Sequence, residues 1–311
     1  MIDEILKTVE YIVEGTKIEE LPKLIHSGVY PSLIVHCNKV LGKSNIDGVD
    51  IDVTEMDDGV LIDMTVNKSI PVPINLCFGV LEKERKQRIN VNLVVKRNAS
   101  VRLTAFCAFP KSHVNHVMDG NFVLEEGATL SYDEYHYHGE ERSVVKPNLN
   151  FVLHDGATMT TSLVLSKGRV GKLDYNLSMS LGKDAKIVAL TRIGGKGDDD
   201  ITISDNARLV GEKSSAVLKA RVVLRDKSRS IFKGKIIGEG SYSRGHIDCK
   251  EVVIDSAVAE SLPQVKVVNP TARLTHETVV GTVEQKEIQA LQVKGLTEEQ
   301  AIDFLVSKLL E

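Results

Sequence analysis

Cysteine and histidine residues gather in four segments of this sequence, and these side chains suit metal or sulfur chemistry. The first two segments are CAFPKSHVNH and EYHYHG. Together they hold Cys107, His113, His116, His136 and His138. Side chains alternate along a strand, so His136 and His138 share one face, and neutral imidazole is a common metal ligand. The spacing HVNH lacks the helical pattern of HExxH. We treat this set as a candidate second metal site, with structural or surface histidines as the alternative.

The other two segments lie nearer the C-terminus. In GHIDCKEVVID, Cys249 follows His246 and Asp248 after a glycine-rich turn. A thiolate beside a histidine can bind a soft metal or carry sulfur, although a lone cysteine in a β-prone stretch is often only a small buried residue. In LTHETVVG, His276 and Glu277 are adjacent. Neighbouring residues on a strand point to opposite faces, so only one of this pair can face a given site.

Strands are expected to position these residues. From Val49 the apolar residues alternate with polar ones, in VDIDVTEM and GVLIDMTV, and Asp57-Asp58-Gly59 supplies a hairpin turn between them. A small turn ending in alanine then recurs before short β-prone runs, at Ala99, Ala128, Ala157, Ala185 and Ala207, with steps of 29, 29, 28 and 22 residues. Such a repeat predicts a stacked array, because one unit cannot bury its apolar face alone.

The fold class predicted from this repeat is mainly β, a parallel β-helix or solenoid, with a β-sandwich as the alternative. Helices are expected at both ends. An apolar stripe of Ile2, Ile5, Leu6, Val9 and Ile12 indicates one helix, and a second is expected over 18–25. Near the C-terminus, capping boxes at Thr282–Gln285 and Thr297–Gln300 predict two helices separated by Gly295. The expected division is a helical region at 1–48, a β-helix at 49–281 and a helical hairpin at 282–311.

Composition restricts the functional classes. Hydrophobic residues make up 42% of the 311 residues, enough for a continuous core, whereas aromatic residues make up 5% and tryptophan is absent. The net charge of −4 gives no general attraction to nucleic acid or to an anionic membrane. No apolar run approaches the roughly 20 residues that cross a bilayer. The four scattered cysteines argue against a disulfide framework. We therefore expect a cytoplasmic protein that binds neither nucleic acid nor membrane.

The order of the C-terminal motifs resembles one known family. The run from Gly245 to Leu310 is similar to the C-terminal part of the SufB and SufD proteins of the SUF system for iron-sulfur cluster assembly. The shared pattern is a cysteine-containing strand, the segment SLPQVKVVNPTARLTHETVVG, a helix, a Gly-Leu-Thr turn and a last helix. The resemblance is strong over about 65 residues, fair over the repetitive middle from about residue 70, and absent or unreadable over the first 60.

The resemblance implies a right-handed parallel β-helix that serves as a scaffold and is not an enzyme. It implies a dimer through the last coils, with a transient iron-sulfur cluster bound at the interface by Cys249 and Glu277 and with His276 beside them. It also implies that the hairpin at 282–311 docks a SufC-type ABC ATPase, because the chain itself lacks a GxxxxGK[ST] loop. The presence of both the cysteine and the His-Glu pair is more typical of SufB, so a homodimer is expected.

Some features depart from the bacterial SufB pattern. The chain is short, and it has no cysteine between Cys107 and Cys249, where bacterial SufB receives sulfur. Three other interpretations compete with the scaffold. One is a lyase-like β-solenoid enzyme or carbohydrate binder, which the scarcity of aromatic residues disfavours. The second is a metal hydrolase built on the histidine set. The third is a purely structural SufD-like subunit without its own cluster.

Overall fold

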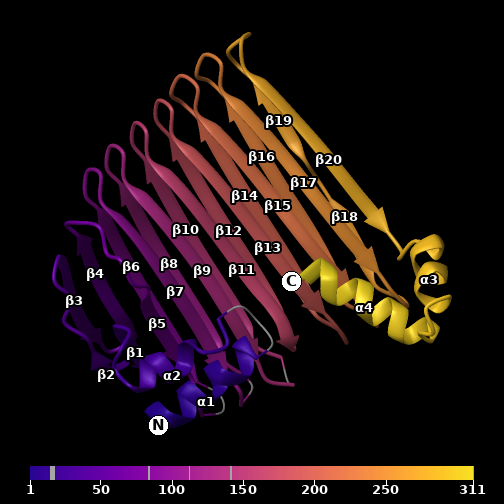
Figure 1. The fold of residues 1–311 in the computed structure, drawn as a ribbon, viewed down its shortest axis with the longest axis horizontal. Coiled ribbons are helices and arrows are strands. Elements are labelled where there is room, and N and C mark those ends of the chain that lie inside the picture. Colours follow the sequence, from indigo (N-terminus) through magenta and orange to yellow (C-terminus); the bar gives the residue numbers. More distant parts are fainter. Residues whose placement is uncertain (15–17, 83–84, 112, 141, 311) are drawn as a thin grey trace.

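The computed structural model is a β-solenoid of about eight turns with helices at both ends (Figure 1). It describes residues 1–14, 18–82, 85–111, 113–140 and 142–310. Two ten-stranded sheets face each other along the stack. The mainly β fold and the parallel β-helix predicted from the turn repeat are therefore confirmed, and the sandwich alternative is wrong.

Sheet A contains, in spatial order, β2 (Lys39–Lys43), β1 (Ser32–His36), β5 (Ile74–Gly79), β7 (Ser100–Phe109), β9 (Thr129–His138), β11 (Thr158–Gly168), β13 (Lys186–Gly195), β15 (Ser215–Leu224), β17 (Arg244–Val253) and β20 (Arg273–Gly281). Sheet B runs through β18 (Val258–Ser261), β16 (Arg229–Gly238), β14 (Asp200–Leu209), β12 (Lys172–Leu181), β10 (Val144–Leu153), β8 (Asn115–Leu124), β6 (Lys86–Val95), β4 (Gly59–Val66) and β3 (Val49–Met56), and β19 (Gln264–Val267) also pairs with β16. The helices are α1 (Ile2–Val13), α2 (Leu21–His26), α3 (Gln285–Gln292) and α4 (Glu298–Leu310).

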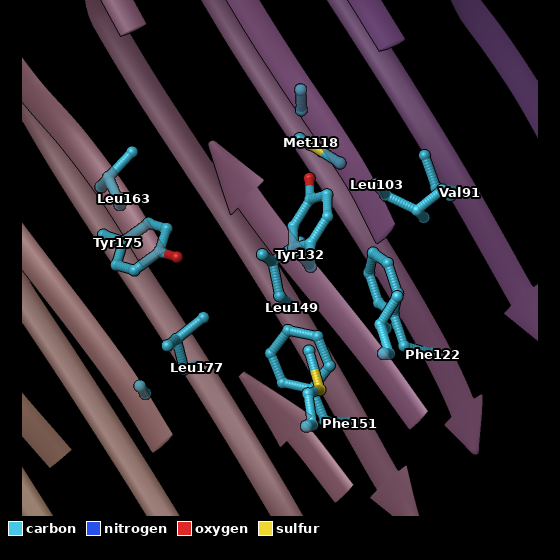
Figure 2. Close-up of a cluster of buried hydrophobic side chains, with 14 of the residues drawn as sticks. Val91, Leu103, Met118, Phe122, Tyr132, Leu149, Phe151, Leu163, Tyr175 and Leu177 are labelled. Carbon is cyan, nitrogen blue, oxygen red and sulfur yellow. The ribbon is translucent and has the colours of Figure 1, made fainter. Parts of the chain in front are cut away.

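The core lies between the two sheets. From β4 to β18 the strands alternate between the sheets along the chain, so a strand pairs in parallel with the strand two positions away, as β9 does with β7 and β11. Every second side chain therefore points inward, and Figure 2 shows Phe122, Tyr132 and Phe151 meeting from both sheets. The centroid of the Phe122 ring lies 5.1 Å from that of Tyr132 and 5.0 Å from that of Phe151. Aromatic packing of this kind is worth about 0.5–1.5 kcal/mol per pair beyond burial.

The repeat is set by a small buried residue at one corner of each coil. Ala99, Ala128, Ala157 and Ala185 occupy that corner, as predicted. The predicted fifth turn at Ala207 is wrong, because Ala207 lies within β14. The buried Ser214 and Ser243 occupy the next two corners, and Ala272 occupies the last. A serine fits because its hydroxyl is small and can bond locally, as Ser214 Oγ does to the Gly211 carbonyl at 2.7 Å.

The N-terminal end of the solenoid is built from two antiparallel hairpins, β1–β2 and β3–β4. Strands begin at Ser32, earlier than the predicted start at Val49, because SLIVH is a continuous apolar run without the alternation that marked later strands. The turn at Asp57–Asp58 joins β3 and β4 in an antiparallel hairpin, as predicted. The apolar stripe of α1 packs on the outer face of sheet A, where Ile5, Leu6 and Val9 join the cluster that contains Phe106.

The C-terminal hairpin, defined as α3 and α4, lies at the other end and reaches back along the outside of sheet A (Figure 1). The predicted capping box at Thr297 is confirmed, since its hydroxyl accepts from the Gln300 amide at 3.2 Å and the Gln300 side chain accepts from the Thr297 amide at 2.9 Å. The box predicted at Thr282 is wrong, because α3 begins at Gln285 without a side-chain cap. Packing of α4 on β13 and β15 is reinforced by the Arg225–Asp303 ion pair at 2.5 Å.

Candidate functional site

Cys249 lies on β17, one strand away from the C-terminal edge of sheet A. It points into the solenoid and is only 1% exposed. Burial is the main reason that the pKa of its thiol is raised to about 12, and the nearby Glu251 carboxyl acts in the same direction. Cys249 is therefore a neutral thiol at physiological pH unless a metal or a base takes its proton.

Glu251 stands beside this thiol, and the sequence analysis missed it. Its Oε1 atom lies 3.6 Å from Cys249 Sγ, and its Oε2 atom accepts a hydrogen bond from the Ser230 hydroxyl on β16. The side chain is 0% exposed, and burial raises the pKa of its carboxyl, with the two hydrogen bonds opposing that shift. The signal was present in the sequence, because Cys-x-Glu on a strand puts both side chains on one face.

The register of β20 against β17 separates His276 from Glu277. Thr278 pairs with Cys249, His276 with Ile247, and Glu277 with Asp248. Because paired residues on parallel strands face the same side, His276 shares the inward face of Cys249, while Glu277 lies on the outward face with Asp248. Both His276 and Glu277 are exposed at this edge. As expected, only one member of the pair can face the Cys249 side.

The two polar residues that precede Cys249 also lie on the outer face. His246 Nδ1 is 2.8 Å from the Thr275 hydroxyl on the edge strand. Asp248 binds Arg221 at 2.6 Å, and that hydrogen bond is the main cause of the lowered pKa of its carboxyl. The histidine next to the cysteine in sequence is thus directed away from the thiol, and Glu251 takes the place beside it.

The first histidine set is largely buried inside the solenoid. Cys107, His116, His136 and His138 all point between the sheets, whereas His113 is exposed in the connection between β7 and β8. Cys107 pairs in register with His136. The centroids of the His136 and His138 rings are 5.6 Å apart. The surface interpretation is therefore wrong for these three histidines.

Glu134 joins this buried set. Its Oε1 accepts from the Tyr132 hydroxyl at 2.5 Å, and its Oε2 lies 3.6 Å from His136 Nε2. Burial lowers the pKa of His138 to about 3 and that of His116 well below its usual value, and the neighbouring histidines act in the same direction. Several ring nitrogens lack a hydrogen-bond partner among the described residues, including both of His136 and Nε2 of His116 and His138.

Within the described ranges, no three cysteine, histidine, aspartate or glutamate side chains are arranged to hold a metal ion. The buried histidine set is thus close-packed but not a formed metal centre. It offers no support for the hydrolase interpretation, which needs a tightly held zinc ion and an open coordination position.

A cavity of about 260 Å³ lies between the Cys249 strand and the C-terminal hairpin. Its wall includes Glu251 and Val252 on β17, Val279 on β20 and Leu305 and Leu309 on α4. The hairpin therefore forms one wall of a cavity that borders the Cys249 coil. Among the helices that the structure describes, none has both the length and the apolar character of a transmembrane span.

Comparisons with known proteins agree with this architecture. Residues 80–308 match the family described as "SUF system FeS cluster assembly, SufBD core domain". An iron-sulfur cluster assembly SufBD family protein of Methanocaldococcus jannaschii is 32% identical over 311 residues, covering 99% of this chain and 96% of the relative. One from Pyrococcus horikoshii is 30% identical, covering 98% and 94%. One from Archaeoglobus fulgidus is 22% identical, covering 99% and 83%. The chain therefore belongs to the SufBD family of iron-sulfur cluster assembly proteins.

Proposed function

We propose that this protein is a scaffold on which an iron-sulfur cluster is built, with Cys249 as a ligand and a second copy of the chain completing the site. The observation that carries the proposal is the place of Cys249, which lies one strand from the open end of the solenoid. A thiol at that place is shielded within one copy and adjacent to the surface on which another copy would pack.

The C-terminal end of the solenoid, called the open end, differs from the N-terminal end in its edge strands. β20 is the outermost strand of sheet A, and the short strands β18 and β19 end sheet B. Apolar side chains here are between 43% and 62% exposed, namely Val258, Leu262, Val267, Val268, Val279 and Val280. Exposed edges with apolar residues are ready to pair with another chain. We infer that two copies meet end to end at this surface.

The opposite edges carry charges that discourage such pairing. β3 presents Asp50, Asp52 and Glu55, and β2 begins and ends with Lys39 and Lys43. Charged edge strands are a common protection against edge-to-edge association. The C-terminal edges carry charges as well, among them Arg273 and Glu277 on β20, so the exposed apolar residues are the feature that distinguishes this end as the proposed dimer surface.

The C-terminal hairpin is the proposed docking element for a SufC-type ABC ATPase. Phe304 on α4 is 44% exposed, and Val293 after α3 is 89% exposed, although both are apolar. The hairpin also walls the cavity beside β17. A partner that pulls on α4 would therefore act on β15, on which α4 packs and which pairs with the Cys249 strand β17. This suits a buried site that must open to receive and release a cluster.

The full ligand set remains a prediction. The family resemblance assigns Glu277 as the second ligand and His276 as a neighbour, and His276 lies on the face shared with Cys249. Carboxylate ligands bind iron-sulfur clusters less firmly than thiolates, since clusters are normally held by cysteine. A cluster held partly by oxygen would be transferred readily, as a scaffold requires.

The test is anaerobic reconstitution of the purified protein with ferrous iron and sulfide, followed by visible and Mössbauer spectroscopy. We expect the wild type and Cys107→Ala to form a cluster and Cys249→Ala to lose it. Cys107→Ala is the matched control, because it also removes a buried inward thiol. Equal spectra from all three proteins, or no iron in any of them, would favour the structural SufD-like subunit instead.

The partner is tested separately with Phe304→Asp, which places a charge on the exposed apolar surface of α4. We expect this variant to keep its fold and to lose binding of the ABC ATPase from the same organism in a sedimentation or co-purification assay. Ser307→Asp is the control, because it makes the same one-unit charge change at another exposed position of α4. Unchanged binding by Phe304→Asp would assign the docking surface elsewhere.

A further inference from the structure

Glu251 has the distance to Cys249 that two ligands of one metal ion require. A tetrahedral first-row metal ion bound to a thiolate at about 2.3 Å and to a carboxylate at about 2.0–2.2 Å holds the two donor atoms about 3.6 Å apart. Cys249 Sγ and Glu251 Oε1 are separated by 3.6 Å. In the metal-free protein the same separation suits a hydrogen bond from the thiol to the carboxylate, so a metal ion can replace the thiol proton with little movement.

The surroundings of Glu251 also favour a cation. The carboxyl group is fully buried, its hydrogen bonds come from a hydroxyl and a thiol, and no ion pair involves it among the described residues. Burying a carboxylate without a positive partner costs several kcal/mol, and such groups usually pair with a cation or coordinate a metal. The nearest inward thiol and this carboxylate are thus the two halves of an incomplete metal site.

We propose that Glu251, rather than Glu277, supplies the carboxylate ligand to the iron bound by Cys249. This inference rests on the proposed scaffold function and assigns its ligand. Glu277 is exposed and lies on the outward face of its strand, opposite to the face of the thiol. With two ligands from one copy, sulfide and the second copy would fill the remaining positions of the metal ion.

The proton balance follows from the state of the two groups. Binding of a divalent metal ion forms a metal–sulfur and a metal–oxygen bond and releases the Cys249 proton to solvent. A protonated Glu251 carboxyl would release a second proton in the same step. Metal affinity must therefore increase with pH.

The experiment uses cobalt(II) alone as a probe, titrated anaerobically into the full-length reduced protein. The readouts are the thiolate-to-cobalt charge-transfer absorption and the dissociation constant. Four proteins are compared, namely wild type, Glu251→Gln, Glu277→Gln and Cys249→Ser. We expect Cys249→Ser to lose the charge-transfer band. Glu251→Gln should weaken binding by about tenfold or more, whereas Glu277→Gln should stay within about twofold of wild type.

The variants keep the fold comparable. Glutamine has the volume of glutamate and can keep a hydrogen bond to Ser230, and thermal unfolding verifies each protein. Glu251→Asp is a second variant that retains the charge but withdraws the carboxylate by one methylene group. It should bind cobalt more tightly than Glu251→Gln and more weakly than wild type. The inference is overturned if Glu251→Gln binds like wild type, if Glu277→Gln shows the loss, or if wild type gives no thiolate band.

These outcomes separate the ligand assignment from the scaffold function. A cluster that requires Cys249 but is unchanged in Glu251→Gln would leave the function standing and remove the ligand assignment. If cobalt binding depends on both Cys249 and Glu251 but no cluster forms from iron and sulfide, the ligand assignment would stand and the scaffold function would be removed.

Discussion

Two buried polar clusters occupy the interior of this solenoid, and they differ mainly in where they sit along the stack. Each pairs a cysteine with a glutamate, Cys107 with Glu134 in one and Cys249 with Glu251 in the other. Complete coils enclose the first on both sides, and α1 covers the outside of its strands. The second lies one strand from an open edge. Burial suppresses the reactivity of both thiols, so access is decided by position in the stack.

The histidine-rich coil and the terminal coil with Cys249 differ in how many neighbouring coils hold them in place. The histidine-rich coil fixes its imidazoles by packing, with Phe109 between His116 and His138 at centroid distances of 5.0 Å and 5.4 Å. Opening it would disrupt coils on either side. Opening the terminal coil disrupts contacts on one side only. A site that must load and release cargo is therefore better placed at the end.

The largest effect is expected from the packed interior. Phe122→Ala removes an aromatic ring that contacts Tyr132 and Phe151, and we expect a loss of about 3–5 kcal/mol in the free energy of unfolding. Val280→Ala, at the exposed edge, should cost less than about 1 kcal/mol. Urea denaturation followed by circular dichroism measures both. Similar losses for the two variants would contradict the difference in packing between the middle and the open end.

The next effect is loss of stability in acid, which originates in the histidine-rich coil. Burial holds the pKa of His138 at about 3, whereas an exposed histidine titrates near 6.5. The unfolded chain therefore binds the proton first, and the stability present above about pH 6.5 is lost as the pH falls toward 3. At about pH 4.5 the loss from His138 is about 2–3 kcal/mol. Urea denaturation against pH should show a shallower slope for His138→Asn than for wild type.

A smaller difference is expected in thiol labelling. In the native protein the half-buried Cys37 should react first with a maleimide, Cys249 next and Cys107 last. Opening of the terminal coil requires less energy than opening of a central one, so we expect Cys249 to react at least about tenfold faster than Cys107, which corresponds to about 1.4 kcal/mol. Mass spectrometry of timed samples measures the order. Equal rates for the two would mean that the solenoid opens only as a whole.

The smallest effect concerns the link between the hairpin and the site. Thr297→Ala removes the confirmed capping box of α4 and should destabilise that helix by about 0.5–2 kcal/mol. Because α4 walls the cavity beside β17, labelling of Cys249 should become faster while labelling of Cys107 stays unchanged. Ser307→Ala, later in the same helix, is the control. No change in Cys249 labelling would separate the hairpin from the site.

Local patterns in the sequence predicted much of this fold. The alanine corners at Ala99 to Ala185 predicted the stacked coils, and the Thr297 box predicted the start of α4. The prediction of the repeat failed at Ala207 because the next two corners are Ser214 and Ser243. A pattern of Gly, Asn or Asp followed by Ala does not include serine at the corner. The box at Thr282 failed because β20 pairs with β17 as far as Gly281, and Thr282 and Val283 then connect that strand to Glu284, the residue before α3. The point at which β20 ends depends on its pairing with β17, which a short window does not contain.

The sequence by itself determined the alternation of apolar residues along the strands, the start of α4 after Thr297 and the presence of Cys249 in a strand. These features depend on neighbours within a few residues. Only the tertiary structure decided which residues meet across coils. Strands pair with partners 28 or 29 residues away, as Asp248 does with Glu277 and Cys249 with Thr278. A shift of one residue in that register would exchange the two faces. The side that Glu277 faces, and the closeness of Glu251 to Cys249 and Ser230, follow from that register and from the packing of the two sheets.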